Sequence, residues 1–219
     1  MHIHGKNFFS IPSSTFLGLL LLTDFVFILL GIAYLAGGGM FFDFYALDTD
    51  RGYAETFQYI KEFWILVLAG IYFLRTRSWM YLFWSAVAGY ILFDDALMIH
   101  EKVGEFIKFY WHLLPQLGLR DQDIGELIVN AAGTVFFFLF FGLTYRYSRP
   151  AERNILFKLL GCLSVYAFFG VGMDLVHGPM DKTFLDPYFL VLEEGGEMVA
   201  ISLMVWYMYS LPDSGQVRV

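Results

Sequence analysis

The sequence predicts an all-α, polytopic membrane protein with six transmembrane helices. Its 219 residues are 58% hydrophobic and 20% aromatic, and its mean hydropathy is +0.59. Soluble domains are only about 45–50% apolar, so this composition is typical of a membrane protein. Six apolar segments are each long enough to cross a hydrocarbon core of about 30 Å at about 1.5 Å per residue. Because no internal repeat or long polar segment divides the chain, residues 1–219 are predicted to form a single membrane domain.

The six predicted spans are residues 15–36, 57–74, 79–100, 124–145, 155–177 and 191–211. The first span ends at three glycines and is longer than the apolar region of a signal peptide, so we expect it to be retained. It contains Asp24, which we expect to be buried and hydrogen-bonded to a neighbouring helix. A place on a proton path is the alternative for this residue.

The second and third spans follow an acidic loop, residues 41–56, and are joined by a short basic turn, residues 75–78. A connection this short makes the two helices antiparallel neighbours. Residues 101–119 then mix aromatic side chains with lysine and histidine, which is typical of a helix that lies at the bilayer surface. We expect this surface helix to end at Pro115 and to cover the site described below.

The fourth span begins with Asp121 and Asp123 as candidate helix caps. A basic loop, residues 146–153, leads to the fifth span, which stops at a Gly-Pro pair, and the sixth span begins with three glutamates. The single cysteine, Cys162, lies in an apolar run, so we interpret it as a packing residue and expect neither a disulfide nor a cysteine-rich zinc motif.

Basic residues in the short connections predict the orientation. Eight of the 14 Lys and Arg residues fall on the side of the N-terminus: Lys6, Arg75, Arg77, Arg146, Arg149, Arg153, Lys158 and Arg218. Most acidic residues fall on the opposite side. By the positive-inside rule, we expect a protein of the bacterial inner membrane with both termini in the cytoplasm and an acidic outer face. The net charge of −7 argues against nucleic acid as a partner and leaves membrane lipids.

Acidic and histidine side chains converge at the predicted outer ends of spans three to six. Asp174 and His177 are three residues apart, as are Glu194 and Glu197, so each pair lies on one helical face. Ionisable groups at a membrane boundary are costly unless they pair, bind an ion or do chemistry. We therefore predict a metal site inside a four-helix unit formed by spans three to six. Its candidate ligands are Asp94, His100, Glu101, Glu126, Asp174, His177, Glu194 and Glu197.

A simpler interpretation stays open for some of these residues. The helix macrodipole favours carboxylates in a first turn, which explains Glu126, Glu193 and Glu194 without a metal. For Asp95 and Glu193 two roles stay open: either they bind the metal, or they orient the residues that bind it. The second helix offers three further candidates for that orienting role, Gln58, Tyr59 and Glu62.

The predicted ligands also limit the choice of metal. Two histidines with several carboxylates and no thiolate suit iron, manganese or zinc. The sequence therefore predicts one or two divalent transition-metal ions per chain, and the surplus of carboxylates favours two.

The segments FDDALMIHEKVGE and LEEGGEM resemble a set of bacterial multipass membrane proteins of unassigned function. These proteins carry Leu-Asp-Glu, then Ile-His-Glu, and later Glu-Glu-x-x-Glu. The matching residues here are Asp94, Asp95, His100, Glu101, Glu193, Glu194 and Glu197. Asp95 stands where the pattern has glutamate. The resemblance spans most of the chain and implies a common six-helix body, but it implies no activity.

From these observations we expect a metal-dependent membrane enzyme that acts at the outer face on a lipid, a quinone or another amphiphile. Hydrolysis is expected if the metal is zinc, and oxidation if it is two irons. A metal-ion or proton transporter and an accessory or sensory subunit with a structural metal are the alternatives. The inner halves of the predicted spans are almost wholly apolar, which favours the enzyme over the transporter.

Overall fold

The computed structural model describes residues 11–37, 42–115, 121–177 and 183–211, and the side chains of Asp174 and His177 lie outside that description. Within these residues every regular element is helical, which confirms the all-α prediction. In chain order the elements are α1 (Ser13–Ala36), the 3₁₀ turn η1 (Asp43–Tyr45), α2 (Tyr53–Thr76), α3 (Trp79–Leu97), α4 (Ile99–Trp111), α5 (Asp121–Tyr147), α6 (Pro150–Ala167), the π-helical turn η2 (Phe168–Met173), α7 (Asp174–His177) and α8 (Asp186–Ser210).

Several of these helices are long and apolar enough to cross a membrane. In the described part of the chain they are α1, α2, α5 and α6 together with η2, and α3 with α4 makes a fifth if that bent pair counts as one span. The last helix, α8, is not among them, because Glu193, Glu194 and Glu197 fall within every stretch of it that is long enough to cross. The prediction of a membrane protein is therefore supported, while the number of six spans stays a prediction.

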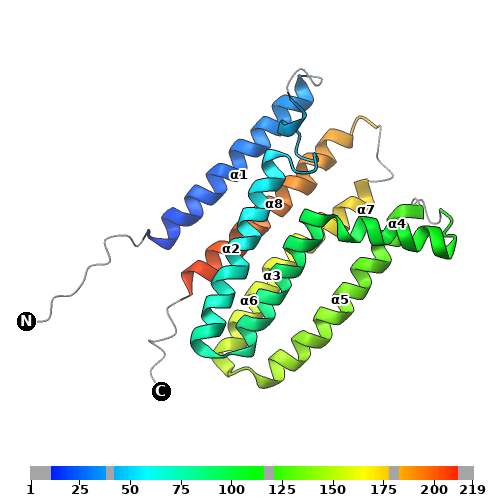
Figure 1. Ribbon diagram of the computed structural model, residues 1–219. Coiled ribbons are helices and arrows are strands. Elements are labelled where there is room, and N and C mark those ends of the chain that lie inside the picture. The colour runs from blue at the N-terminus through cyan, green and yellow to red at the C-terminus, as the bar shows by residue number, and fades with distance from the viewer. Residues whose placement is uncertain (1–10, 38–41, 116–120, 178–182, 212–219) are drawn as a thin grey trace, which may run out of the picture.

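The helices pack unevenly around one core. α2 contacts α3 and α8, and α8 also contacts α1, α6 and η2 (Figure 1). Large buried side chains such as Trp84 on α3, Ile65 on α2, Leu159 on α6 and Ile201 on α8 fill the space between them. α5 instead packs mainly on α4 and contributes only half-buried phenylalanines to the core. The contacts thus join α2, α3, α6 and α8. The four-helix unit expected from the sequence consisted instead of the third to sixth predicted spans.

The two ends of the bundle differ in chemistry. The start of α1, the α2–α3 and α5–α6 connections and the end of α8 lie at one end (Figure 1). The α1–α2 connection, α4 and the start of α8 lie at the other, which we call the acidic end. This end carries the carboxylate-rich segments that the sequence predicts to be outside.

The predicted third span is wrong at its end. α3 stops at Leu97, three residues before the expected boundary, because Met98 adopts a left-handed conformation with φ 55° and ψ 47°. The chain turns by 67° there and continues as α4, which ends at Trp111, before Pro115. α4 leans so closely on α5 that a Cβ on Gly125 would lie 2.3 Å from the carbonyl oxygen of Gly104. His100 and Glu101 therefore belong to the first turn of α4 and do not continue the face of α3 that bears Asp94.

The π-helical turn η2 brings the end of α6 close to α8. Such turns are frequent at functional sites, because the extra residue per turn redirects neighbouring side chains. A Cβ on Gly170 would lie 2.7 Å from Oε1 of Glu197, and a Cβ on Gly196 would lie 2.3 Å from the ring of Phe169. Glycine at both positions lets η2 and α8 approach around Glu197.

Candidate functional site

The bend between α3 and α4 gathers three ligand-type side chains, Asp94, Asp95 and His100. One potential ligand atom from each lies within 4.8 Å of the others. The backbone N–H of His100 donates to Oδ1 of Asp94 at 2.8 Å, which fixes the first turn of α4 against the last turn of α3. Nδ1 of His100 lies 3.3 Å from Oδ2 of Asp94, but the two atoms do not meet with hydrogen-bond geometry. Both atoms are therefore placed to share a third partner.

Glu62 of α2 faces this group from inside the bundle. Its side chain is fully buried, and neither carboxyl oxygen has a hydrogen-bond donor among the described residues. It interacts at close range with Asp95 and electrostatically with Glu197 of α8. A buried carboxylate without a partner costs several kcal/mol, so this arrangement needs a compensating group.

Neutral donors surround the same acids. The hydroxyl of Tyr166 on α6 donates to Oδ2 of Asp95 at 3.2 Å, and the hydroxyl of Tyr59 donates to the backbone carbonyl of Asp95 at 3.3 Å. Nε2 of Gln58 donates to Oε2 of Glu197 at 3.2 Å. These groups orient the carboxylates without supplying positive charge.

Next to Glu62 along α2 lies Lys61, which forms a fully buried ion pair. Nζ of Lys61 on α2 lies 2.8 Å from Oδ1 of Asp24 on α1, and both side chains are inaccessible to solvent. Nζ also donates to the carbonyl of Met198 at 2.8 Å and to Oγ of Ser202 at 3.2 Å, and Ser202 donates to the other oxygen of Asp24 at 2.5 Å. Asp24 is thus buried and bonded to neighbouring helices as expected. Its partner, Lys61, was not predicted from the sequence.

Further acids stand above the site at the acidic end. Glu194 interacts electrostatically with Glu193 and Glu197, and with Asp48 and Glu55 at the start of α2. Glu101 interacts in the same way with Glu55, as well as with Asp50 and Glu126. The loop between α1 and α2 therefore adds negative charge around the approach to the buried acids.

The structure brings some of the predicted ligands together and leaves others apart. Asp94 and His100 adjoin each other, Glu197 lies beside Glu62, and Glu101 and Glu194 lie in the acidic surroundings. Glu126 lies at the α4–α5 contact, where it accepts a hydrogen bond from Gln122 at 2.9 Å. No hydrogen bond joins it to Asp95 or Glu197 in the part of the chain that the structure describes. The side chains of two other predicted ligands, Asp174 and His177, lie outside the described residues.

Sequence reasoning assigned too small a role to α2. Glu62 was expected only to orient ligands, and Lys61 and Tyr166 had no role at the site. The available indication was the adjacent charged pair Lys61-Glu62 within an apolar segment, about 14 Å along α2 from its start. Which faces of α6 and α8 turn toward that pair could not be predicted from their own patterns.

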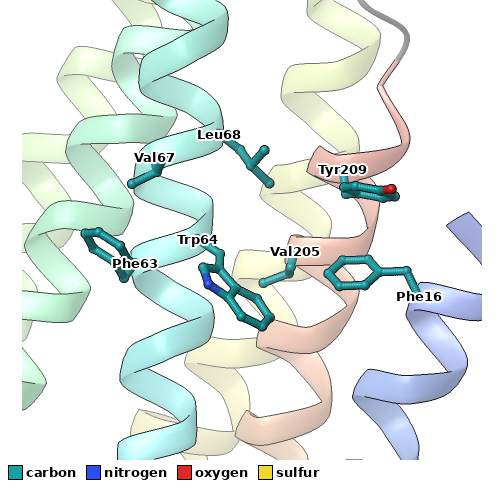
Figure 2. Close-up of a pocket in the computed structure, with 7 residues that line it drawn as sticks. All are labelled: Phe16, Phe63, Trp64, Val67, Leu68, Val205 and Tyr209. Atoms are coloured by element: carbon teal, nitrogen blue, oxygen red, sulfur yellow. The ribbon is translucent and has the colours of Figure 1, made fainter. Parts of the chain in front are cut away.

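A separate apolar cavity of about 250 Å³ opens between α1, α2 and α8 (Figure 2). It is lined by Phe16, Phe63, Trp64, Val67, Leu68, Val205 and Tyr209. None of the acidic side chains described above reaches it. Its lining is suited to an apolar chain and offers no chemistry.

Comparison with known proteins gives one match. The model of a family described as "Domain of unknown function (DUF8692)" matches residues 19–211. No curated protein and no solved structure matches the chain.

Proposed function

The chain belongs to the DUF8692 family, of unknown function, and we propose that it is a metal-dependent integral membrane enzyme. The observation that carries this proposal is the group formed by Asp94, Asp95 and His100, whose ligand atoms lie within 4.8 Å of one another. Imidazole with carboxylates suits iron, manganese or zinc. Nδ1 of His100 lies 3.3 Å from a carboxylate oxygen of Asp94, a separation at which the two atoms pair with each other or bind one cation.

The protein is proposed to cross the bacterial inner membrane six times with both termini in the cytoplasm. Each predicted span coincides with a helix or a run of consecutive helices. Both ends of the described chain and the basic connections lie at the end opposite the acidic one (Figure 1). In this orientation the metal-binding group lies toward the outer face, within the depth of the bundle.

The buried polar residues favour an enzyme over a transporter. A transporter needs polar groups that lead from the site to the cytoplasmic side. The network around Lys61 stops at Ser202, and the next buried side chains of α8 are Met204, Val205 and Met208. A site that is accessible from one side is suited to chemistry at that side.

The substrate is proposed to be amphiphilic and to reach the site from the membrane. α4 starts at the metal-binding group and exposes Phe106, Phe109, Tyr110 and Trp111 along its length. Aromatic side chains of this kind gather where bilayer and water meet. These side chains lie about 12–20 Å along α4 from Met98, so an apolar tail that packs on them would let a lipid or quinone head reach the bend.

The bound metal would supply Lewis acidity or electron transfer to this head group. The chain's own residues hold the ligands in place: Tyr166 and Tyr59 bond Asp95, and the backbone of His100 bonds Asp94. The side chain of Asp94 is buried, whereas that of His100 is 27% exposed, which leaves the metal-binding group accessible.

The experiment compares His100→Asn with His112→Asn, a matched change at the exposed histidine that directly follows α4. We expect the first variant alone to lose metal and to change the lipid or quinone composition of cell membranes. Loss of metal with no change in lipids, quinones or oxygen consumption would indicate an accessory subunit. Metal-dependent ion flux in liposomes would indicate a transporter, and an unchanged metal content would refute the assignment of His100.

A further inference from the structure

We infer that the site holds two divalent cations and that Glu62, Asp95 and Glu197 bind the second one, with Asp95 shared between both. We call these three residues the carboxylate cluster. This inference rests on the proposed metal-dependent function and adds a ligand, Glu62, together with a chemical class for the second ion.

The first argument is the state of Glu62. Its side chain has no exposed surface, and both of its oxygens lack a donor among the described residues. Buried polar groups are nearly always hydrogen-bonded, and a buried carboxylate is costly unless it is paired. Its side chain interacts with those of Asp95 and Glu197, which are carboxyl groups like itself. Such groups lie together without a cation only when they share a proton, and a divalent cation can take the place of that proton.

The second argument is that the nearby basic side chains already have other partners. An ammonium group has three hydrogens, and Lys61 directs them to Asp24, Met198 and Ser202, away from its neighbour Glu62. Its charge is balanced by Asp24 at 2.8 Å. His100 lies against Asp94. Lys61 and His100 therefore each lie against an aspartate outside the carboxylate cluster.

The third argument concerns the space around Glu197. Gln58 bonds its Oε2, while Oε1 lies where a Cβ on Gly170 would be only 2.7 Å away. Glycine at that position in η2 lets the carboxyl group of Glu197 lie against the backbone of η2. Ligand atoms of Glu62, Asp95 and Glu197 do not all lie within 4.8 Å of one another, unlike those of Asp94, Asp95 and His100. Carboxylates without a cation repel one another, and a cation between them would draw Glu197 toward Glu62 and Asp95.

The ligand types distinguish the two ions. The carboxylate cluster offers only oxygen atoms as ligands. The hydroxyl of Tyr166, which bonds Asp95, adds one uncharged oxygen to them. Such sites suit hard cations such as Mn²⁺ and Mg²⁺, whereas the imidazole of His100 suits iron, manganese or zinc. Mn²⁺ is accepted by both kinds of site and is therefore the probe of choice.

The test counts Mn²⁺ bound to the purified full-length protein in detergent, by elemental analysis and electron paramagnetic resonance. We expect two ions per chain in the wild type, one in Glu62→Gln and one in His100→Asn. The matched control is Glu105→Gln, at an exposed glutamate of α4, which should keep two ions. Thermal unfolding in EDTA shows whether each variant is folded, and Glu62→Gln should melt no lower than the wild type.

The outcomes separate the inference from the proposed function. A wild type with one ion that His100→Asn removes and Glu62→Gln keeps would overturn the second site and leave the proposed function standing. One ion that both variants remove would mean a single shared position, which also overturns the inference. A wild type that binds no Mn²⁺, iron or zinc would overturn both.

Discussion

The buried pair of Lys61 and Asp24 offers the clearest energetic prediction. Both side chains are fully buried, and the charged atoms lie 2.8 Å apart. Asp24→Asn keeps an acceptor for Lys61 and a partner for Ser202 but removes the negative charge. Lys61 is then left as an uncompensated cation among helices α1, α2 and α8.

The expected loss follows from the burial. Breaking a buried ion pair by removing one partner costs about 3–5 kcal/mol. Because the amide of Asn still accepts a hydrogen bond, we expect a loss at the lower end, about 3 kcal/mol. For a chain of this length this loss corresponds to a fall of about 6–12 °C in the melting temperature.

The assay is thermal unfolding of the purified protein in detergent with EDTA present, so that metal does not contribute. The matched control is Asp43→Asn, at an exposed carboxylate that accepts one hydrogen bond from Tyr34, and it should change stability by less than about 1 kcal/mol. Asp24→Leu combined with Lys61→Met replaces the pair by apolar side chains and should recover most of the loss. A melting temperature of Asp24→Asn within about 2 °C of the wild type would refute the reasoning, as would a double variant no more stable than the single one.

Three further predictions concern the buried acids. Glu62→Gln should unfold in EDTA at the wild-type temperature or higher, because it removes an uncompensated buried charge; a clear fall in melting temperature would contradict that reading. Tyr166→Phe removes the donor to Asp95 and should weaken Mn²⁺ binding by about 10-fold without changing the number of ions, so an unchanged affinity in a titration would count against it. Gly170→Ala should displace the neighbouring glutamate of α8 and lose one ion, whereas Gly161→Ala, whose Cβ meets nothing within 4 Å, should lose none.

The helices themselves could be predicted, because long apolar runs with polar connections specify them. The bend at Met98 could not. It lies between Leu97 and Ile99, in a stretch with neither glycine nor proline, and methionine rarely adopts a positive φ. The close contact of α4 with α5 at Gly104 and Gly125 accompanies this bend. Such a contact depends on both helices and cannot be predicted from the sequence pattern of one of them.

Part of the candidate site could also be predicted from the sequence. Asp94, His100 and Glu197 were identified because acids near helix ends in apolar segments are unusual. The burial of Glu62 and the hydrogen bond from Gln122 to Glu126 could not be predicted, since the sequence does not specify which helices pack together. The structure puts α2 between α3 and α8 and leaves α5 at the side, so α2 supplies the buried carboxylate.

The most direct test of the account is the metal content of the protein as purified, without added chelator, beside that of the double variant Glu62→Gln, His100→Asn. The account predicts iron, manganese or zinc in whole-number ratio to the wild-type chain and none in the double variant. A wild type that is folded, free of metal and not stabilised by any of these ions would contradict it, and so would a double variant that keeps its metal.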